Sequence, residues 1–384
     1  MKDLQKISAF FLLGALGSEI AHAQSTSPTD ADTVLCPSPF VSTRAAGMGG
    51  ALSTLAEGLD ALYYNPAGIG GLRSDPRTNS LFFPYVGASL NENAGSVRNQ
   101  FNASQAQRDS STGAAIIDAN EGNRQYARGS IIPIGLLLGR TALVPVLDSQ
   151  LAAVPNGQNS GQVKLRYRAF TGAMIGTSIA DNGNRFSLGI SQSVGTIEET
   201  MGTYNYVDMV DSYQRKKILR ENRNIYAASA ANAGMVVRIP KGITPTFSLV
   251  ARNIGNTKNI AKADGVDPLV FDEDLTAGFS ISPRVGKIGV FNLLLESGYL
   301  TQKHMAARKK VRGGMELLLG GHNGKSLFGV RAGGNDAGWS AGLHVNLGLI
   351  GVEVESHAID IGLNNDRIIE RRGSGVVYID LASF

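Results

Sequence analysis

The stretch VKLRYRAFTGAMIGTSIA, residues 163–180, alternates between two faces. Most of its odd-numbered positions are apolar, among them Val163, Leu165 and Ile175, whereas its even-numbered positions include Lys164, Arg166, Arg168 and Gly176. A period of two predicts a β-strand with one apolar face. The stretch is much longer than the usual strand of about five or six residues, and it exceeds the 9–11 residues of a tilted membrane strand.

The same alternation recurs along most of the chain. Phe186, Leu188 and Ile190 share one face, as do Trp339, Leu343 and Leu347. Candidate strands lie near residues 81–89, 129–138, 141–148, 163–180, 185–194, 225–239, 246–253, 275–282, 288–299, 311–320, 326–333, 339–348, 350–358 and 375–384. The pattern therefore predicts about 14 strands.

The connections between these strands alternate in length. Long polar segments follow the first, third, fifth, seventh, ninth and thirteenth strands, and short turns such as DNGN at residues 181–184 lie between them. Short turns at one end and long loops at the other are typical of outer-membrane barrels. A closed sheet also leaves no backbone group unpaired in hydrocarbon. We therefore predict an all-β fold, a transmembrane antiparallel β-barrel.

Charged residues of the predicted strands fall on the face opposite the apolar one. A charge facing lipid at mid-bilayer costs roughly 2–4 kcal/mol, so we expect these side chains to point into the lumen. The polar residues predicted to face the lumen are Lys164, Arg166, Arg168, Arg252, Arg331, His344, Glu353 and Glu355, together with Arg238 and Glu316.

The N-terminus reads as a secretory signal. Lys2 and Lys6 precede an apolar run at residues 7–17, and AHA at residues 21–23 offers a cleavage site, so a mature chain is expected to begin near Gln24. The rest of the chain contains no run of 18 apolar residues, so the sequence predicts no membrane helix. The single cysteine, Cys36, rules out an internal disulfide.

The segment RAAGMGGALSTLAEGLDALYYNPAGIGGL, residues 44–72, differs from the strand pattern. Leucines 52, 55, 59 and 62 have helical spacing, and Thr54 with Glu57 fits a capping box, so a short helix is expected from about Thr54 to Asn65-Pro66. The residue before a proline is forced out of helical geometry. The glycines lack the strand, spacing and Lys-Ser/Thr ending of a nucleotide-binding loop.

Residues 44–72 resemble the N-terminal signature of the FadL/OmpP1-type outer-membrane superfamily, which includes PorV-like proteins of type IX secretion. The likeness lies in GMGGA and, above all, in NPAG at residues 65–68. It implies a fourteen-stranded barrel (residues 77–384) that encloses an N-terminal plug, or hatch (residues 24–76). The plug residues expected to bind ligand, gate or pack are Gly47, Gly49, Gly50, Leu55, Leu59, Leu62, Tyr64, Asn65, Pro66 and Ala67.

The resemblance implies uptake of hydrophobic, long-chain fatty-acid-like compounds across a Gram-negative outer membrane, gated by the hatch. The alternative is a PorV-like barrel that docks or shuttles secreted proteins. His344, Glu353, Glu355 and His357 share the lumen face near Ser340, but no spacing demands a nucleophile and base, so no enzyme is predicted. We expect no cofactor and no metal, because these residues lack a recognised ligand spacing.

The net charge of +4 gathers in predicted external loops. The cations are Arg215, Lys216, Lys217, Arg220, Arg223, Arg308, Lys309, Lys310, Arg367, Arg371 and Arg372. They suit either the phosphates of lipopolysaccharide or plain solvation. No basic stripe with interleaved aromatics indicates nucleic acid. We expect a monomeric barrel in contact with outer-membrane lipids, with a hydrophobic small molecule or a secreted protein as partner.

Overall fold

The computed structural model describes residues 35, 36, 38, 40–70, 80–94, 122–156, 161–205, 208, 212–262, 266–286, 289–303, 305–320, 326–362 and 367–382. The predicted signal peptide, residues 1–23, lies outside the described residues, as do residues 71–79 between the plug and the first strand.

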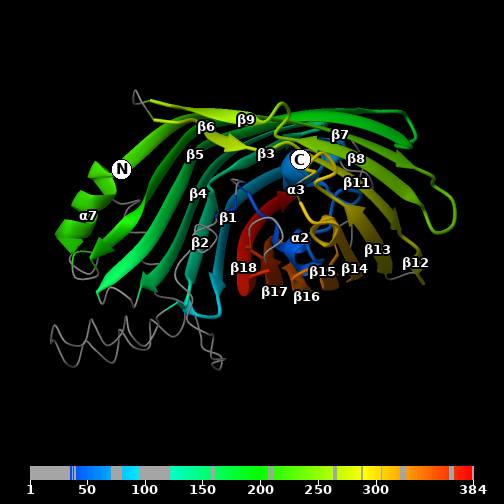
Figure 1. Cartoon of the computed structure of the whole chain (residues 1–384). Helices are drawn as coiled ribbons and strands as arrows, with labels where there is room; N and C mark the ends of the chain where they lie inside the picture. The colour runs from blue at the N-terminus through cyan, green and yellow to red at the C-terminus, as the bar shows by residue number, and fades with distance from the viewer. Residues whose placement is uncertain are drawn as a thin grey trace.

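One antiparallel sheet contains every strand of the described residues (Figure 1). Its strands are β1 (Ser80–Asn91), β2 (Gln125–Ile132), β3 (Gly135–Leu138), β4 (Thr141–Asn156), β5 (Gln162–Ala180), β6 (Phe186–Asn205), β7 (Arg223–Arg238), β8 (Thr246–Arg252), β9 (Thr257–Ala261), β10 (Leu269–Phe271), β11 (Asp274–Ile281), β12 (Arg284–Val285), β13 (Gly289–Ser297), β14 (Val311–Leu319), β15 (Phe328–Asn335), β16 (Gly338–Leu347), β17 (Ile350–Asp360) and β18 (Ile369–Ala382).

The sheet closes into a barrel because β1 pairs with both β2 and β18, with Val86 opposite Ile131 on one side and Val377 on the other. Some consecutive strands are segments of a single barrel strand, here called a stave, that is interrupted along its length. These sets are β2 with β3, β8 with β9, and β10 with β11 and β12. The described strands thus form 14 staves, which confirms the predicted barrel.

The two faces of the wall differ as the alternation predicts. On β5, Ile175 and Ile179 are 46% and 68% exposed, whereas the residues just before them, Met174 and Ser178, are buried. Trp339 and Leu347 on β16 are also exposed on the outer face, and His344 is buried on the inner one. The outer face is therefore apolar, and the buried charges belong to the lumen side. Among the described residues, no helix combines the length and the apolar character needed to cross a membrane.

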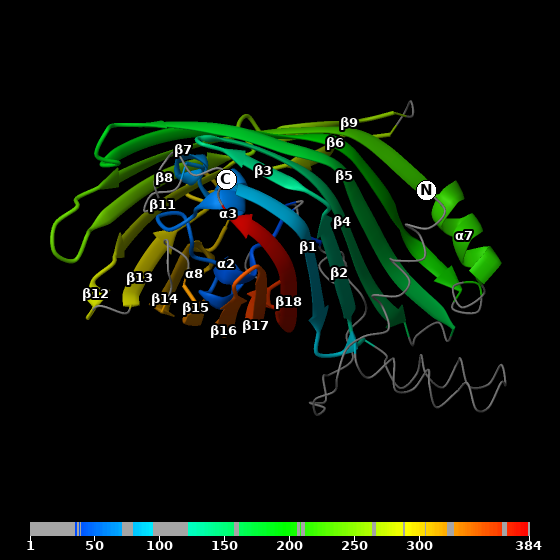
Figure 2. The same ribbon diagram turned by 180° about the vertical axis from the view of Figure 1, so that it is seen from behind.

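Residues 40–70, here called the inner segment, lie inside the curve of the sheet (Figures 1 and 2). The segment contains α2 (Thr43–Gly47), α3 (Gly58–Tyr64) and the 3₁₀ turn η2 (Pro66–Gly68). Two further helices, α7 (Ser212–Glu221) and α8 (Ala307–Lys310), belong to the connections between strands.

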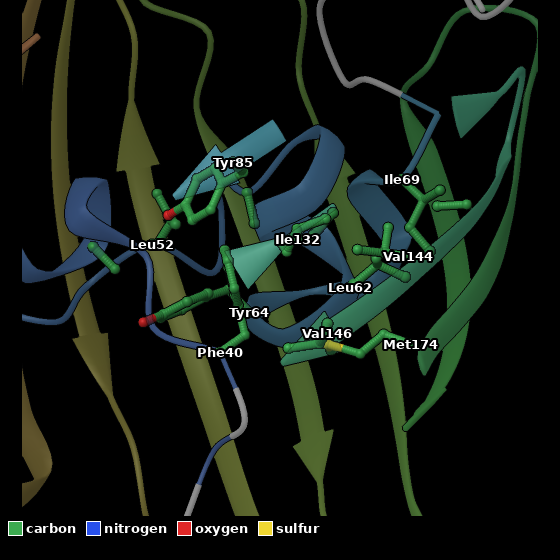
Figure 3. Close-up of a cluster of buried hydrophobic side chains, with 14 of the residues drawn as sticks. Phe40, Leu52, Leu62, Tyr64, Ile69, Tyr85, Ile132, Val144, Val146 and Met174 are labelled. Atoms are coloured by element: carbon green, nitrogen blue, oxygen red, sulfur yellow. The ribbon is translucent and has the colours of Figure 1, made fainter. Parts of the chain in front are cut away.

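The largest apolar core forms between the inner segment and the wall (Figure 3). Leu62 and Ile69 of the segment pack with Val144 and Val146 of β4 and Met174 of β5. Phe40 lies 5.9 Å from Tyr85 of β1, measured between ring centroids. Burying such side chains stabilises the fold by about 1.5–3 kcal/mol each, so the segment contributes to the core of the protein.

Glycines in the wall make room for this segment. A Cβ atom added to Gly189 would lie 2.2 Å from the Pro66 carbonyl, and one added to Gly234 would lie 2.0 Å from the Asn65 side-chain oxygen. A Cβ atom added to Gly278 would likewise lie too close to Ser53, and one added to Gly314 or Gly333 would lie too close to Met48. The backbone of the inner segment therefore approaches the strands more closely than any side chain allows.

The predicted start of the helix is wrong. The helix begins at Gly58, its N-cap residue Glu57 makes no side-chain capping bond, and residues 53–55 form a turn. The carboxylate of Glu296 on β13 accepts from the backbone N–H groups of Leu52 and Ser53, so a distant side chain holds the chain at this turn, before the helix begins. The predicted end is confirmed, because α3 stops at Tyr64 and Asn65 is extended.

The glycine contacts predict the effect of adding one methyl group. We expect Gly189→Ala to lower the stability by about 1–3 kcal/mol, because the Cβ atom collides with the Pro66 backbone. Gly129→Ala is the matched control, since its Cβ atom would meet nothing nearer than the Ser149 hydroxyl at 3.7 Å. Thermal unfolding in detergent measures both, and equal melting temperatures would contradict the proposed contact.

Candidate functional site: the barrel lumen and the inner segment

A buried network of charges fixes α2 to the wall. Arg44 donates to Glu316 through Nε at 2.9 Å and Nη2 at 2.7 Å, and Arg331 donates to the same carboxylate at 2.8 Å. Arg331 also donates to Glu353, which accepts from the Thr43 hydroxyl at 2.7 Å. Glu316 is completely buried. The network thus joins the inner segment to β14, β15 and β17.

A second carboxylate holds the middle of the inner segment. Glu296 binds the N–H groups of Leu52 and Ser53 through Oε1 and receives Arg312 Nε on Oε2 at 2.9 Å. The Ser53 hydroxyl lies 2.7 Å from that of Ser248 on β8. These N–H groups lie between α2 and α3 and belong to neither helix, so the wall supplies their acceptor.

Neutral hydrogen bonds hold the end of the segment. Asn65 donates to the Ser53 carbonyl at 2.7 Å and accepts from Ala67 N–H at 3.1 Å. The hydroxyls of Ser191 and Ser187 on β6 donate to the carbonyls of Leu62 and Ala67, both at 2.6 Å. The Asn-Pro-Ala turn is therefore tied both to its own segment and to the wall.

The predicted plug residues lie together in the inner segment. Gly47 is at the end of α2, and Gly49 and Gly50 have φ angles of +70° and +90°, which favour glycine. Leu55, Leu62, Tyr64, Asn65, Pro66 and Ala67 are buried, and Leu59 is half-buried against the same core.

Residues of the inner segment, and residues just before it in the chain, line one side of a cavity. The empty space between its lining residues, open solvent at its mouth included, is about 510 Å³. Cys36, Ser38 and Tyr63 line it on the segment side, and residues of β4 to β7, β9 and β10, with Asn253, line it on the barrel side. Along β5, Arg168 and Phe170 at the cavity precede Gly176 and Ser178 at the end of the inner segment. The cavity therefore lies on the long-loop side of α3 and η2.

An arginine pair borders this cavity. Arg168 donates to Glu199 Oε1 through Nε at 3.0 Å and Nη2 at 2.7 Å, and Arg166 donates to the same oxygen at 3.0 Å. Gln150 holds the chain at Cys36, accepting from its N–H at 2.9 Å and donating to its carbonyl at 3.0 Å. Of the other predicted lumen residues, Arg252 pairs with Asp274 at 2.6 Å, and Lys164 follows the inward parity of β5.

The histidines of the lumen pair with carboxylates rather than with a nucleophile. His344 Nδ1 lies 3.2 Å from Glu353, and His357 Nδ1 lies 2.7 Å from Glu355. The Ser340 hydroxyl is buried and has no hydrogen-bond partner among the described residues. Within the described part of the chain, no three His, Cys, Asp or Glu side chains are grouped as metal ligands.

Several predicted loop cations form ion pairs within the protein. Arg308 pairs with Asp336, Lys309 with Asp360, and Arg372 with Glu370. Arg371 stacks over Trp339, with Cζ 3.7 Å from the ring centroid. Arg371 and Arg372 lie within β18 and not in a loop, which corrects the prediction, because this strand begins earlier than its apolar pattern does. Binding of lipopolysaccharide stays a prediction.

Sequence reasoning missed three kinds of residue. Glu296 and Arg312 were not singled out, although they hold the inner segment, and the cavity residues Asn232, Asn253 and Asn259 were not recognised. The missed wall glycines Gly189 and Gly234 do have a sequence pattern. Each stands at an inward position in the middle of a strand, where glycine is otherwise unfavourable.

Comparison with solved structures finds other β-barrels. The chain is similar to the toluene transporter TbuX of Ralstonia pickettii, with 10% identity, a TM-score of 0.46, and coverage of 90% of this chain and 98% of that one. It is also similar to the Pseudomonas putida toluene transporter TodX, with 10% identity, a TM-score of 0.45, and coverage of 89% and 98%. A FadL homologue of Pseudomonas aeruginosa matches with 10% identity, a TM-score of 0.33, and coverage of 89% and 97%.

FadL-type barrels are thus among the structures that this chain resembles, as residues 44–72 indicate. No protein-family model matches the sequence, and the search of curated proteins gives no match.

The charge network predicts a large effect of removing Glu316. We expect Glu316→Gln to cost about 3–5 kcal/mol, because Arg44 and Arg331 lose the carboxylate that offsets their buried charges. Glu198→Gln is the control. It breaks an exposed pair with Arg223, and such pairs contribute about 0–1 kcal/mol. Urea unfolding in detergent measures both, and equal midpoints would refute the structural role of Glu316.

Asp60 of α3 predicts a pH dependence. Burial raises the pKa of this carboxyl to about 6, although the Arg44 guanidinium acts in the opposite direction. The folded state then holds a proton that the unfolded state releases from about pH 4 upward, so stability falls as the pH rises from about 4 through 6. Melting temperatures at pH 4, 5, 6 and 7 should fall more steeply for the unchanged protein than for Asp60→Asn. Parallel curves would exclude this role of Asp60.

Proposed function

We propose that this protein is an outer-membrane barrel that takes up hydrophobic compounds, with long-chain, fatty-acid-like compounds as the first class to test. The observation that carries the proposal is the cavity that the barrel wall and the inner segment line together. A compound in this space touches Tyr63 of α3 and Phe170 of the wall at once. Ligand pockets usually combine such apolar surface with a few placed polar groups.

The closed barrel supports the outer-membrane location. Its exposed outer face carries Ile175, Ile190, Leu343 and Trp339, which suits contact with hydrocarbon. The cleaved signal peptide predicted at residues 1–23 would direct the chain out of the cytoplasm. Together these features favour a location in the outer membrane of a Gram-negative cell.

We further propose that the inner segment acts as the gate. It packs against strands on most sides of the barrel, among them β4 to β7 and β15 to β18. A compound that passes through the lumen therefore has to pass the segment. The Asn65 turn is held less strongly than α2, because neutral hydrogen bonds hold it where buried ion pairs hold α2.

An uptake experiment tests both parts of the proposal. Cells that produce the protein should accumulate a labelled long-chain fatty acid faster than cells without it. Asn65→Ala removes two hydrogen bonds of the turn and should change this rate at least about threefold. Asn222→Ala, which alters an exposed asparagine at the end of α7, is the control.

The outcomes separate the candidate functions. No uptake by the unchanged protein would refute transport, and an exported protein that co-purifies with it would favour the PorV-like docking barrel. If Asn65→Ala leaves the uptake rate unchanged, the proposed transport function is retained and the proposed gating by the inner segment is refuted.

A further inference from the structure

The cavity beside Arg168 does not have the lining expected for a long alkyl chain. Its residues with polar side chains are Ser38, Asp148, Gln150, Arg168, Ser193, Ser229, Asn232, Asn253 and Asn259. The amides of Asn232, Asn253 and Asn259 each donate one hydrogen bond within the protein, and an alkyl chain laid over them would leave their remaining donors and acceptors without partners, which is unfavourable. The lining therefore suits a shorter compound with polar groups of its own.

The charges at the cavity are unequal around Glu199. Arg166 and Arg168 both direct their guanidinium groups to a single carboxylate oxygen, Glu199 Oε1. Arg128 differs, because Asp148 faces it alone at 2.7 Å. Two guanidiniums and one carboxylate leave a positive charge, and a planar guanidinium binds a carboxylate particularly well.

Aromatic rings surround the same guanidinium. The Phe271 ring centroid lies 5.4 Å from Arg168 Cζ, and Tyr63 and Phe170 add two more rings to an apolar lining that also includes Ile197, Ala228 and Ala230. Aromatic side chains pack best against another ring, in stacked or edge-to-face geometry. The amides of Asn232, Asn253 and Asn259 lie around the remaining edge of the cavity.

We propose that the cavity binds a small aromatic carboxylate, with its carboxylate at Arg168, its ring between Phe170, Phe271 and Tyr63, and its polar substituents at the asparagine amides. This inference rests on the proposed transport function and names the class of compound. It separates the ligand from uncharged hydrocarbons, which would not use Arg168, and from long-chain acids, whose tails would cover the amides.

The sequence supplies its own reporter for this cavity. Cys36 is the single cysteine of the chain, is partly exposed and lines the cavity. A ligand in the cavity therefore shields the thiol from a small neutral reagent such as methyl methanethiosulfonate. The experiment measures the rate of Cys36 modification in the detergent-solubilised full-length protein against the concentration of 2-naphthoate, 2-naphthamide or palmitate.

We expect 2-naphthoate to slow the modification and 2-naphthamide, which has the same ring without the charge, to require at least about tenfold more for half protection. Arg168→Gln should raise the half-protecting concentration of 2-naphthoate about tenfold or more. Glu199→Gln should lower it, because the competing carboxylate is gone. Arg223→Gln, which changes the exposed pair with Glu198, is the matched control and should leave it unchanged.

Opposite effects of Arg168→Gln and Glu199→Gln cannot both arise from damage to the fold. The two variants together therefore distinguish ligand binding from a loss of folding. Equal protection by 2-naphthamide, protection by palmitate at lower concentration than by 2-naphthoate, or no protection by 2-naphthoate would each overturn the inference. Uptake of a labelled fatty acid by the unchanged protein is measured separately. If that uptake persists, the failure concerns the class of compound and not the transport function.

Discussion

Closure of the sheet by the pairing of β1 with β18 is the constraint on which the rest of the structure depends. Every backbone group of a strand in hydrocarbon needs a partner, and closure provides partners at both edges. It also fixes which side chains face outward, because a shift of one residue in register would exchange the two faces. The exposed Ile179 and the buried Ser178, adjacent on β5, show how sharply the faces are separated.

A closed wall of 14 staves encloses space, and the inner segment occupies part of it. Its short helices and the turn between them leave backbone groups without partners in the segment, so the wall supplies partners: Glu296 for the N–H groups of Leu52 and Ser53, and Ser191 for the Leu62 carbonyl. Wall glycines let the segment approach closely, the Pro66 backbone at Gly189 and the Asn65 side chain at Gly234. The inward residues of the strands therefore fit the inner segment, just as the outward residues suit contact with lipid.

The sequence predicted the wall well and the lumen poorly, for a physical reason. Alternation is a local property, so the strands, their number and the outward position of Trp339 could be inferred, and so could the end of α3 at Asn65-Pro66. The start of that helix could not, because residues 53–55 form a turn that Glu296, more than 230 residues away, holds through the N–H groups of Leu52 and Ser53. The Arg166 and Arg168 pairing with Glu199 likewise depends on the register of β5 with β6, which no local pattern specifies.

The attachment of the N-terminal region differs along its length, and this difference bears on how a gate could work. Around Cys36 and Ser38 the chain is held mainly through its backbone by the side chains of Gln150 and Arg128. Around Arg44 it is held by ion pairs that are buried with Glu316, and separating these would leave uncompensated charges at a cost of several kcal/mol. Hydrogen bonds of the first kind contribute about 1 kcal/mol each, or somewhat more where Arg128 donates. The chain at the cavity can therefore separate from the wall far more readily than α2 can, so a movement that admits a ligand need not expel the inner segment.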